Sequence, residues 1–418
     1  MKLRERDLPQ LHRVRRSFPR PVLPDLERSL FEQLEQHRTL VRPGSSIAIG
    51  VGSRGIARLA RVVRVVASWV TTRGGGPFIV PAMGSHGGAT AEGQAQILAD
   101  YGVQAESVGA PIRSSMEVVE LRQDGCEARV YQDRQAFESD GIIVINRVKP
   151  HTDFHGRHES GLMKMIAIGL GKRAQAAEIH RHGVRGLRDL MPEVARRVLA
   201  QSKPILGIGI VENAYEEIAD IRAVPGPEIP DRDASMLNHA RDLMPALPVD
   251  QLDLLIVDQI GKDISGVGLD TNVIGRLGIR GEPDPERPRI KAIIARELTP
   301  GSHGNALGIG LADVITRRLY DSIDSKPLYE NLYVSGFLER GKVPIVAQSD
   351  AEALFYALRA CPGIDPTRAR VIRIQNTLRL DSLHVSSAVL KDLEGRNDIE
   401  VLEPVGAWCE ESGELTPF

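Results

Sequence analysis

Histidines are concentrated in one short part of this chain. Of its eleven histidines, five lie between residues 151 and 182, namely His151, His155, His158, His180 and His182. Imidazole changes protonation near neutral pH and is a common metal ligand, so this density is typical of proton transfer or metal binding. The alternative is a solvated, polar helix and loop face with no chemical role.

Two known kinds of site can be compared with this segment. Zinc or iron could be held by His151, His155 and His158. Their spacing, however, matches neither HExxH nor the histidine pairs of zinc fingers. The GLGK sequence at 169–172 differs from a phosphate-binding loop, because Ile166 replaces the first glycine and Arg173 replaces the serine or threonine. We keep the metal site as an alternative and exclude the phosphate loop.

Polar residues also follow two earlier apolar runs. Ser53 and Arg54 come after the run at 45–52, and the guanidinium of an arginine binds anions through a planar fork of donors. His86 comes after the run at 77–84 in a glycine-rich loop, and glycine lets the backbone approach a ligand closely. The alternative for each is an ordinary turn residue.

Short apolar runs bounded by Gly or Pro alternate with helix-like stretches. Strands are predicted at 45–52, 77–84, 141–148, 205–213, 252–261, 291–297 and 369–375. Helices are predicted at 56–72, 90–102, near 306–323 and at 350–360. This alternation predicts βαβ units in largely parallel sheets, an α/β fold. Ligands of such folds bind outside the carboxyl ends of the strands, where the polar residues above lie.

The length of the chain predicts more than one domain. Its 418 residues exceed one ordinary core, since domains run to about 100–200 residues. The stretch 224–233 is rich in proline and acids and predicts a loop, after which a new series of strands begins. We expect residues 1–250 to form an N-terminal α/β domain carrying the candidate site. Residues 251–418 would form a second α/β domain that closes an inter-domain active-site cleft.

Composition excludes several classes of protein. A net charge of -2 disfavours dedicated nucleic-acid or membrane-surface binding, and no apolar run approaches the ~20 residues that span a bilayer. The three cysteines are widely separated and form no CxxC pair, which fits a reducing cytoplasm. A plain NAD enzyme is disfavoured because GSRGIA, and no GxGxxG, follows the first predicted strand.

The order of these segments resembles the lactate-racemase family, whose members use a nickel-pincer nucleotide. That family has an Asp-x-Thr-Arg-Pro-like turn, a Gly-Thr-His-Arg-like loop, and then Pro-His-x-x-x-Gly-x-Ser-Gly-Gly-x-Lys with a His sixteen residues later. Here GSRG, GSHGG and PHTDFHGRHESGLMK take those places, the last with about three extra residues. Sixteen residues lead from Lys164 to His180. The resemblance covers roughly residues 40–190 and is weak beyond them.

The resemblance implies a role for each matching residue. Lys164 would be linked through a thioamide to the cofactor, a nickel complex of pyridinium-3-thioamide-5-thiocarboxylic acid mononucleotide. His180 would complete the nickel coordination, with His182 as a nearby competitor for that role. Ser53, Ser160 and Gly161 would line the cofactor.

The resemblance also assigns the catalytic residues. His86 and His151 would be the two acid–base histidines, and Arg54 would hold the substrate carboxylate. Inverting a 2-hydroxy acid requires a base on each face of the carbon, and its hydride needs an acceptor that no side chain supplies. We therefore expect an isomerase, a racemase or epimerase of a small-molecule 2-hydroxy acid, that depends on upstream cofactor-biosynthesis enzymes and is compatible with a homo-oligomer. The alternatives are a zinc or iron hydrolase at the histidine cluster and a non-catalytic nickel-binding protein.

The sequence departs from this family where the substrate would bind. The family has an Asp-x-Asn-x-Tyr-Gln-x-x-Lys-like segment, but here Gly266, Val267 and Asp270 stand where Tyr, Gln and Lys are expected. An acid accepts hydrogen bonds from hydroxyl groups, so Asp270 favours a larger, hydroxylated 2-hydroxy acid as substrate. The alternative is a simple turn residue. Residues that could replace the lost cation are Lys262, Asn272 and Arg276.

Overall fold

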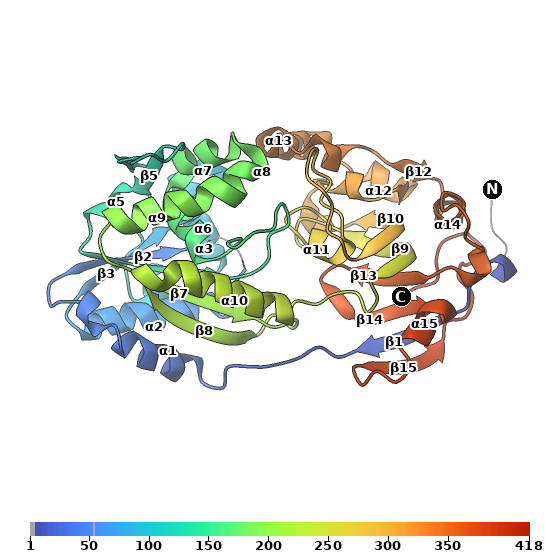
Figure 1. The fold of residues 1–418 in the computed structure, drawn as a ribbon, viewed down its shortest axis with the longest axis horizontal. Helices are drawn as coiled ribbons and strands as arrows, with labels where there is room; N and C mark the ends of the chain where they lie inside the picture. Colours follow the sequence, from blue (N-terminus) through green and yellow to red (C-terminus); the bar gives the residue numbers. More distant parts are fainter. Residues whose placement is uncertain (1–4, 53–54) are drawn as a thin grey trace. The chain divides into compact units, whose positions relative to one another are not determined.

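The computed structural model describes residues 5–52 and 55–418, which form two compact units (Figure 1). One unit comprises residues 19–244, and the other comprises residues 1–18 together with 245–418. The expected boundary at residue 250 placed the first eighteen residues in the N-terminal domain. The structure instead groups them with residues 245–418. Within the described residues, none of the helices has the length and apolar character needed to cross a membrane.

The unit of residues 19–244 contains a five-stranded sheet in the order β3-β2-β6-β7-β8. Its strands are β2 (Ser46–Val51), β3 (Gly76–Pro81), β6 (Gly141–Arg147), β7 (Ile205–Glu212) and β8 (Ile218–Pro225). The first four are parallel and β8 is antiparallel to β7. A separate hairpin pairs β4 (Val118–Leu121) with β5 (Val130–Asp133).

Helices cover both faces of this sheet. They are α1 (Leu26–Glu35), α2 (Leu59–Thr72), α3 (Ala91–Asp100), α4 (Ala105–Val108), α5 (Arg134–Glu138), α6 (Leu162–Lys164), α7 (Lys172–His180), α8 (Gly183–Arg185), α9 (Met191–Gln201) and α10 (Ile229–Leu243). The apolar face of α2, including Val62, Val66 and Trp69, packs with α1 on one side of the sheet. Helix α10 packs on β7 through Met236. The predicted strands and the helix at 56–72 therefore form here with small shifts of their ends.

The strand order of this sheet reverses at β2. From β2 the chain passes to β3 on one side and later to β6 on the other. Helices that follow such a pair of strands leave in opposite directions, and the crevice between the strand ends is where ligands of open α/β sheets bind. A ligand site is therefore expected at the carboxyl ends of β2 and β6.

The second unit contains an eight-stranded sheet in the order β12-β11-β10-β9-β13-β14-β1-β15. Its strands are β1 (Leu11–Arg16), β9 (Gln251–Ile260), β10 (Arg289–Leu298), β11 (Val314–Thr316), β12 (Ile345–Ala347), β13 (Val371–Asn376), β14 (Arg379–Ser386) and β15 (Ile399–Pro404). The five from β12 to β13 are parallel. Its helices are α11 (Thr271–Ile274), α12 (Arg317–Asp321), α13 (Ser325–Ser335), α14 (Asp350–Arg359) and α15 (Ser387–Asp392). The predicted class, two α/β units with mostly parallel sheets, is confirmed.

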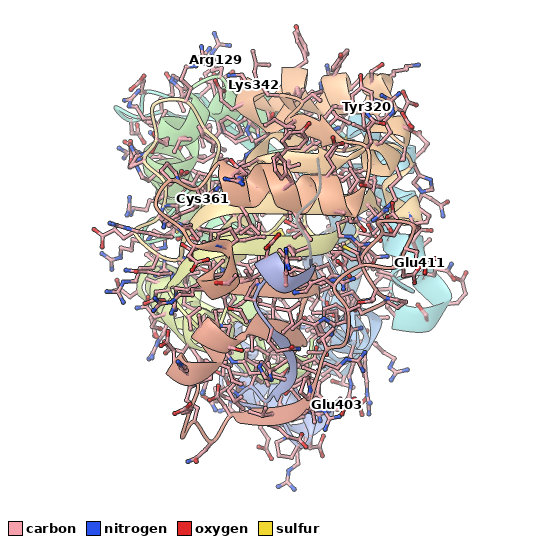
Figure 2. All side chains as sticks on the ribbon, turned by 90° about the vertical axis from the view of Figure 1, so that its right-hand side faces the viewer. Arg129, Tyr320, Lys342, Cys361, Glu403 and Glu411 are labelled. Carbon is pink, nitrogen blue, oxygen red and sulfur yellow. The ribbon has the colours of Figure 1, made fainter. Side chains whose placement is uncertain are left out.

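The first strand of the chain completes the sheet of the second unit. β1 lies between β14 and the edge strand β15, on which Glu403 is exposed (Figure 2). Leu11 and Val14 of β1 are buried, and Trp408 donates through its indole Nε1 to the carbonyl of Pro9 at 2.8 Å. No strand was predicted here, because only two apolar residues interrupt a basic segment.

Two local predictions were wrong. The stretch 224–233, expected to be a loop, contains the end of β8 and the start of α10, because Pro227 and Pro230 lie in first turns where a helix tolerates proline. The helix expected near 306–323 is replaced by short turns, the strand β11 and the short helix α12. Apolar residues at 306–315 are buried in turns and a strand, which periodicity alone does not distinguish from a helix.

We expect Val14→Asp to destabilise the second unit by about 3 kcal/mol or more, since it buries a carboxylate without a partner. Trp408 fluorescence during urea unfolding, in a Trp69→Phe background, would report on this unit alone because the chain has two tryptophans. Arg15→Gln is the matched control, since this neighbouring side chain is exposed. Equal stability of the two variants would contradict a structural role for β1.

Candidate active site

The candidate site lies at the carboxyl ends of β3, β2 and β6. Gly52 follows β2, and a Cβ atom there would lie 2.9 Å from Cε of Met165 and 3.0 Å from Oδ1 of Asn146. A side chain at position 52 would therefore have to displace the ends of Met165 and Asn146, and glycine lets β2 approach β6 and the segment after α6 without that shift. Ser53 and Arg54 come next and lie outside the described residues, so their roles stay predictions.

Three of the predicted residues come together at this edge. Lys164, at the end of α6, places its Nζ 2.6 Å from Nε2 of His151, in the segment after β6. The other ring nitrogen of His151, Nδ1, accepts the backbone N–H of Asp153 at 3.0 Å, and the ring packs against Phe154. His180, the last residue of α7, lies close enough for the charge of Lys164 to act on it. Residues distant in sequence thus form one cluster.

The surroundings of His180 favour its neutral form. Although its ring is exposed to solvent, the protein atoms around it lower its pKa, and the positive charge of Lys164 lowers the pKa further. Asp153 opposes this shift. The competing His182 is engaged elsewhere, because its ring accepts from Arg181 at 3.2 Å and lies 3.6 Å from Glu127. The assignment of His180 rather than His182 as the metal ligand stays a prediction.

A buried carboxylate holds the loop that carries His151. Glu159 accepts the backbone N–H of His151 at 2.6 Å and that of Gly156 at 3.0 Å. Its carboxylate also meets the ring of His155 at 3.3 Å and the guanidinium of Arg241, on α10, at 2.6 Å. Burial alone would raise the pKa of Glu159, but these hydrogen bonds outweigh burial and lower its pKa. The loop is therefore closed around an ionised carboxylate.

A second carboxylate holds the start of α6. Asp233 accepts the backbone N–H of Leu162 at 2.6 Å and lies 3.4 Å from Nδ1 of the buried His158. A Cβ atom on Gly161 would lie 2.2 Å from Asp233, so this glycine, predicted to line the cofactor, is required by packing. Ser160 exchanges backbone hydrogen bonds with Lys149 in an isolated bridge. The predicted cofactor segment is thus anchored just ahead of Lys164.

The metal site expected as an alternative at the first three histidines does not form. His151 faces Lys164, His155 faces Glu159, and His158 faces Asp233. In the described part of the chain, His, Cys, Asp and Glu side chains make no group of three or more that could hold a metal ion. A nickel site at His180 would accordingly need ligands from a cofactor.

His86 lies exposed at the tip of the loop after β3. Gln94, a buried residue of α3, donates to the carbonyls of Gly84 at 2.9 Å and of His86 at 3.3 Å. Below the loop, Lys172 donates to the carbonyl of Pro81 and lies 3.2 Å from Asp133. Burial lowers the pKa of Lys172, and Asp133 opposes that shift. This lysine of the GLGK sequence therefore supports a strand end and is too deeply buried to bind phosphate.

Asp270 caps a short helix in the second unit. Its Oδ1 accepts the backbone N–H of Asn272 at 2.9 Å, and its own N–H donates to Thr377, which follows β13. Asp270 therefore lies at the carboxyl edge of this sheet, and its N-cap role agrees with the turn alternative. Lys262 donates to Gly266 and Asn331, while Arg276 donates to Asp313 and three backbone carbonyls.

The residues that position the cluster were not predicted from the sequence. They are Glu159, Asp233, Asn146, Gln94 and Arg241. One signal was available, since the Pro-His to Lys segment is about three residues longer here than in the family it resembles. The extra length falls in the stretch containing His158 and Glu159, both buried. Nothing in the sequence pointed to Asp233 or Arg241, which lie on α10, more than 70 residues away.

The fold is similar to that of a known racemase. The structure of the lactate racemase apoprotein from Thermoanaerobacterium thermosaccharolyticum matches with a TM-score of 0.54 at 12% sequence identity, over 90% of this chain and 95% of that one. No protein-family model and no curated protein matches the sequence. At this identity the likeness establishes a shared fold.

We expect Glu159→Gln to lower the free energy of unfolding by about 1–3 kcal/mol at neutral pH, because an amide cannot accept all of these hydrogen bonds. A carboxyl whose pKa falls on folding contributes stability above its ordinary value of 4.5. That contribution is lost as the pH falls below 4.5, so the two proteins should converge in acid. Urea unfolding at a series of pH values measures this, and a difference that grows in acid would contradict it.

Proposed function

We propose that this chain is a racemase or epimerase of a 2-hydroxy acid that works with a nickel-pincer nucleotide. The observation that carries the proposal is the cluster of Lys164, His151 and His180 at the topological switch point of the first sheet. The lactate-racemase fold supports it, because the family resemblance of the sequence assigns roles to these same three residues.

The residues present fit the cofactor. Lys164 offers an amine for covalent attachment, and the lowered pKa of His180 favours the neutral imidazole that metals bind. Gly52, beside Met165, and Gly161, three residues before the lysine, add no side chains to the backbone near it. Ser53 and Ser160 are proposed to line the same group. When bound, the cofactor supplies the hydride acceptor and the soft sulfur ligands that the chain lacks.

His151 and His86 are the proposed acid–base pair. Asp153 can serve both states of the His151 ring. Its backbone N–H lies 3.0 Å from Nδ1 and suits the neutral ring, whereas its carboxylate lies 3.9 Å away and suits the protonated one. His86 follows β3 and His151 follows β6, so the two histidines belong to separate loops. This agrees with one base for each face of the substrate carbon.

The cofactor can be tested by co-expression with a pincer-biosynthesis system. We expect a nucleotide-sized mass adduct with near-stoichiometric nickel, and the loss of both in Lys164→Ala. His180→Ala should keep the adduct and lose most of the nickel, whereas the matched variant His182→Ala should keep both. Intact-protein mass and metal analysis provide the readout. An adduct that survives in Lys164→Ala, or nickel lost equally in the two histidine variants, would contradict these assignments.

The substrate is proposed to be larger and more hydroxylated than lactate, with Asp270 accepting a hydroxyl hydrogen bond. We expect Asp270→Asn to raise KM for hydroxylated acids about tenfold, since an amide is a weaker acceptor than a carboxylate, and to leave lactate little affected. The measurement is the rate of Cα epimerisation across a panel of 2-hydroxy acids. Fastest turnover of lactate itself would overturn this assignment.

A further inference from the structure

A cavity of about 460 Å³ lies in the second unit, at the carboxyl ends of three neighbouring parallel strands. These strands are β10, β11 and β12, and ligands of α/β sheets bind outside such strand ends. The cavity walls include Arg296 and Glu297 of β10, Arg317 and Arg318 after β11, and Gln348 and Ser349 after β12. Its volume lies within the range of sites for small molecules.

Carboxylates surround the two less exposed arginines of this cavity. Nε of Arg318 lies 3.1 Å from the carboxylate of Glu297, and its Nη2 lies 2.9 Å from that of Asp350. The third partner of Arg318 is Glu414, which also lines the cavity. Nη2 of Arg296 lies 2.5 Å from the same Asp350, and its Nη1 lies 2.8 Å from an aspartate of β9. The positive charges are therefore matched by carboxylates, and the guanidinium groups are held in fixed orientations.

This balance of charges selects against a charged ligand. An anion attracted by Arg318 would also face the carboxylates of Glu297 and Glu414, and like charges at short range repel. A cation would meet the guanidinium groups in the same way. Across the described residues, no group of three or more His, Cys, Asp and Glu side chains could hold a metal ion. The ligand best suited to the cavity is therefore uncharged.

The walls offer hydrogen-bond donors and acceptors side by side. Arg317 is exposed, its Nε lies 2.9 Å from Asp321, and its guanidinium lies over the ring of Tyr320, which is exposed at the surface (Figure 2). This guanidinium, the amide of Gln348 and the hydroxyl of Ser349 provide donors, and the carboxylates of the cavity provide acceptors. A hydroxyl group both donates and accepts, so a compound with several hydroxyl groups is complementary to both kinds of partner.

We propose that this cavity binds an uncharged, polyhydroxylated compound of the sugar class, through hydrogen bonds to planar side chains that ion pairs already hold in place. Ordering these side chains costs little on binding, because folding has already fixed them. The site belongs to the second unit and uses none of the residues assigned to the cofactor or to the hydroxy acid. The proposal therefore does not rest on the proposed function.

The test measures binding of neutral hexoses to the full chain expressed without the cofactor pathway. The probes are glucose, galactose and mannose at millimolar concentration, and saturation-transfer NMR detects the bound sugar. We expect at least one of the three to bind, and a titration gives its Kd. The absence of binding by all three hexoses would overturn the proposal.

Two variants locate the bound sugar in the cavity. Arg317→Ala and Gln348→Ala each remove an exposed donor, and each should raise the Kd about tenfold through the loss of its hydrogen bonds. Arg280→Ala is the matched control, because Arg280 is an exposed arginine of the same unit that pairs with Glu339 outside the cavity, and its Kd should be unchanged. Circular dichroism checks that each variant is folded. A Kd unchanged in both cavity variants, or raised equally in the control, would refute binding at this site.

The balance of charges has a test of its own. The hexose that binds best is compared with the uronate and the amino sugar of the same configuration, and both should bind more weakly. Glu297→Gln removes one carboxylate from beside Arg318, so it should shift the preference toward the uronate. Tighter binding of either charged sugar to the unaltered chain would overturn the uncharged class of ligand. A preference that does not move in Glu297→Gln would refute the balance of charges as its cause. Neither result depends on whether the chain acquires nickel.

Discussion

The buried carboxylate of Glu159 determines where His151 lies, and through it the contact with Lys164. An ionised carboxylate without water is costly unless donors surround it, and here two backbone N–H groups, a histidine ring and Arg241 do so. Because Arg241 belongs to α10, the loop is tied to a helix that packs on the sheet. The position of the catalytic candidate thus follows from satisfying one buried charge.

The sheet provides the frame for this loop. Parallel strands β3, β2 and β6 end at one edge, and the reversal of strand order at β2 opens the space in which the glycine-rich turns and the histidine loop meet. Gly161 packs against the carboxylate of Asp233, and a side chain at Gly52 would displace Met165 and Asn146, so both glycines allow close packing of the backbone at this edge. The same architecture recurs in the second unit, where Asp270 and Thr377 follow β9 and β13.

The two departures from the family pattern have different structural consequences. The longer Pro-His to Lys segment contains the buried residues His158 and Glu159, which hold the loop in place. The lysine and histidine of the pattern, Lys164 and His151, are still in contact. In the second unit, Lys262 and Arg276 donate hydrogen bonds to other partners. Neither of them donates to Asp270 in these contacts. The sequence around Lys164 therefore matches the family pattern more closely than the sequence around Asp270 does.

The sequence by itself determined the α/β class, the strands that carry the candidate residues, and the identity of Lys164, His151 and His180 as residues to examine. Those features are local, because strand periodicity, glycine-rich turns and motif spacing are expressed within a few tens of residues. The tertiary structure decided that β1 joins the other unit, that Lys164 meets His151, and that Glu159, Asp233 and Arg241 hold the loop. Each of these depends on partners brought together from distant parts of the chain, where burial makes one hydrogen-bonding arrangement far more stable than the others.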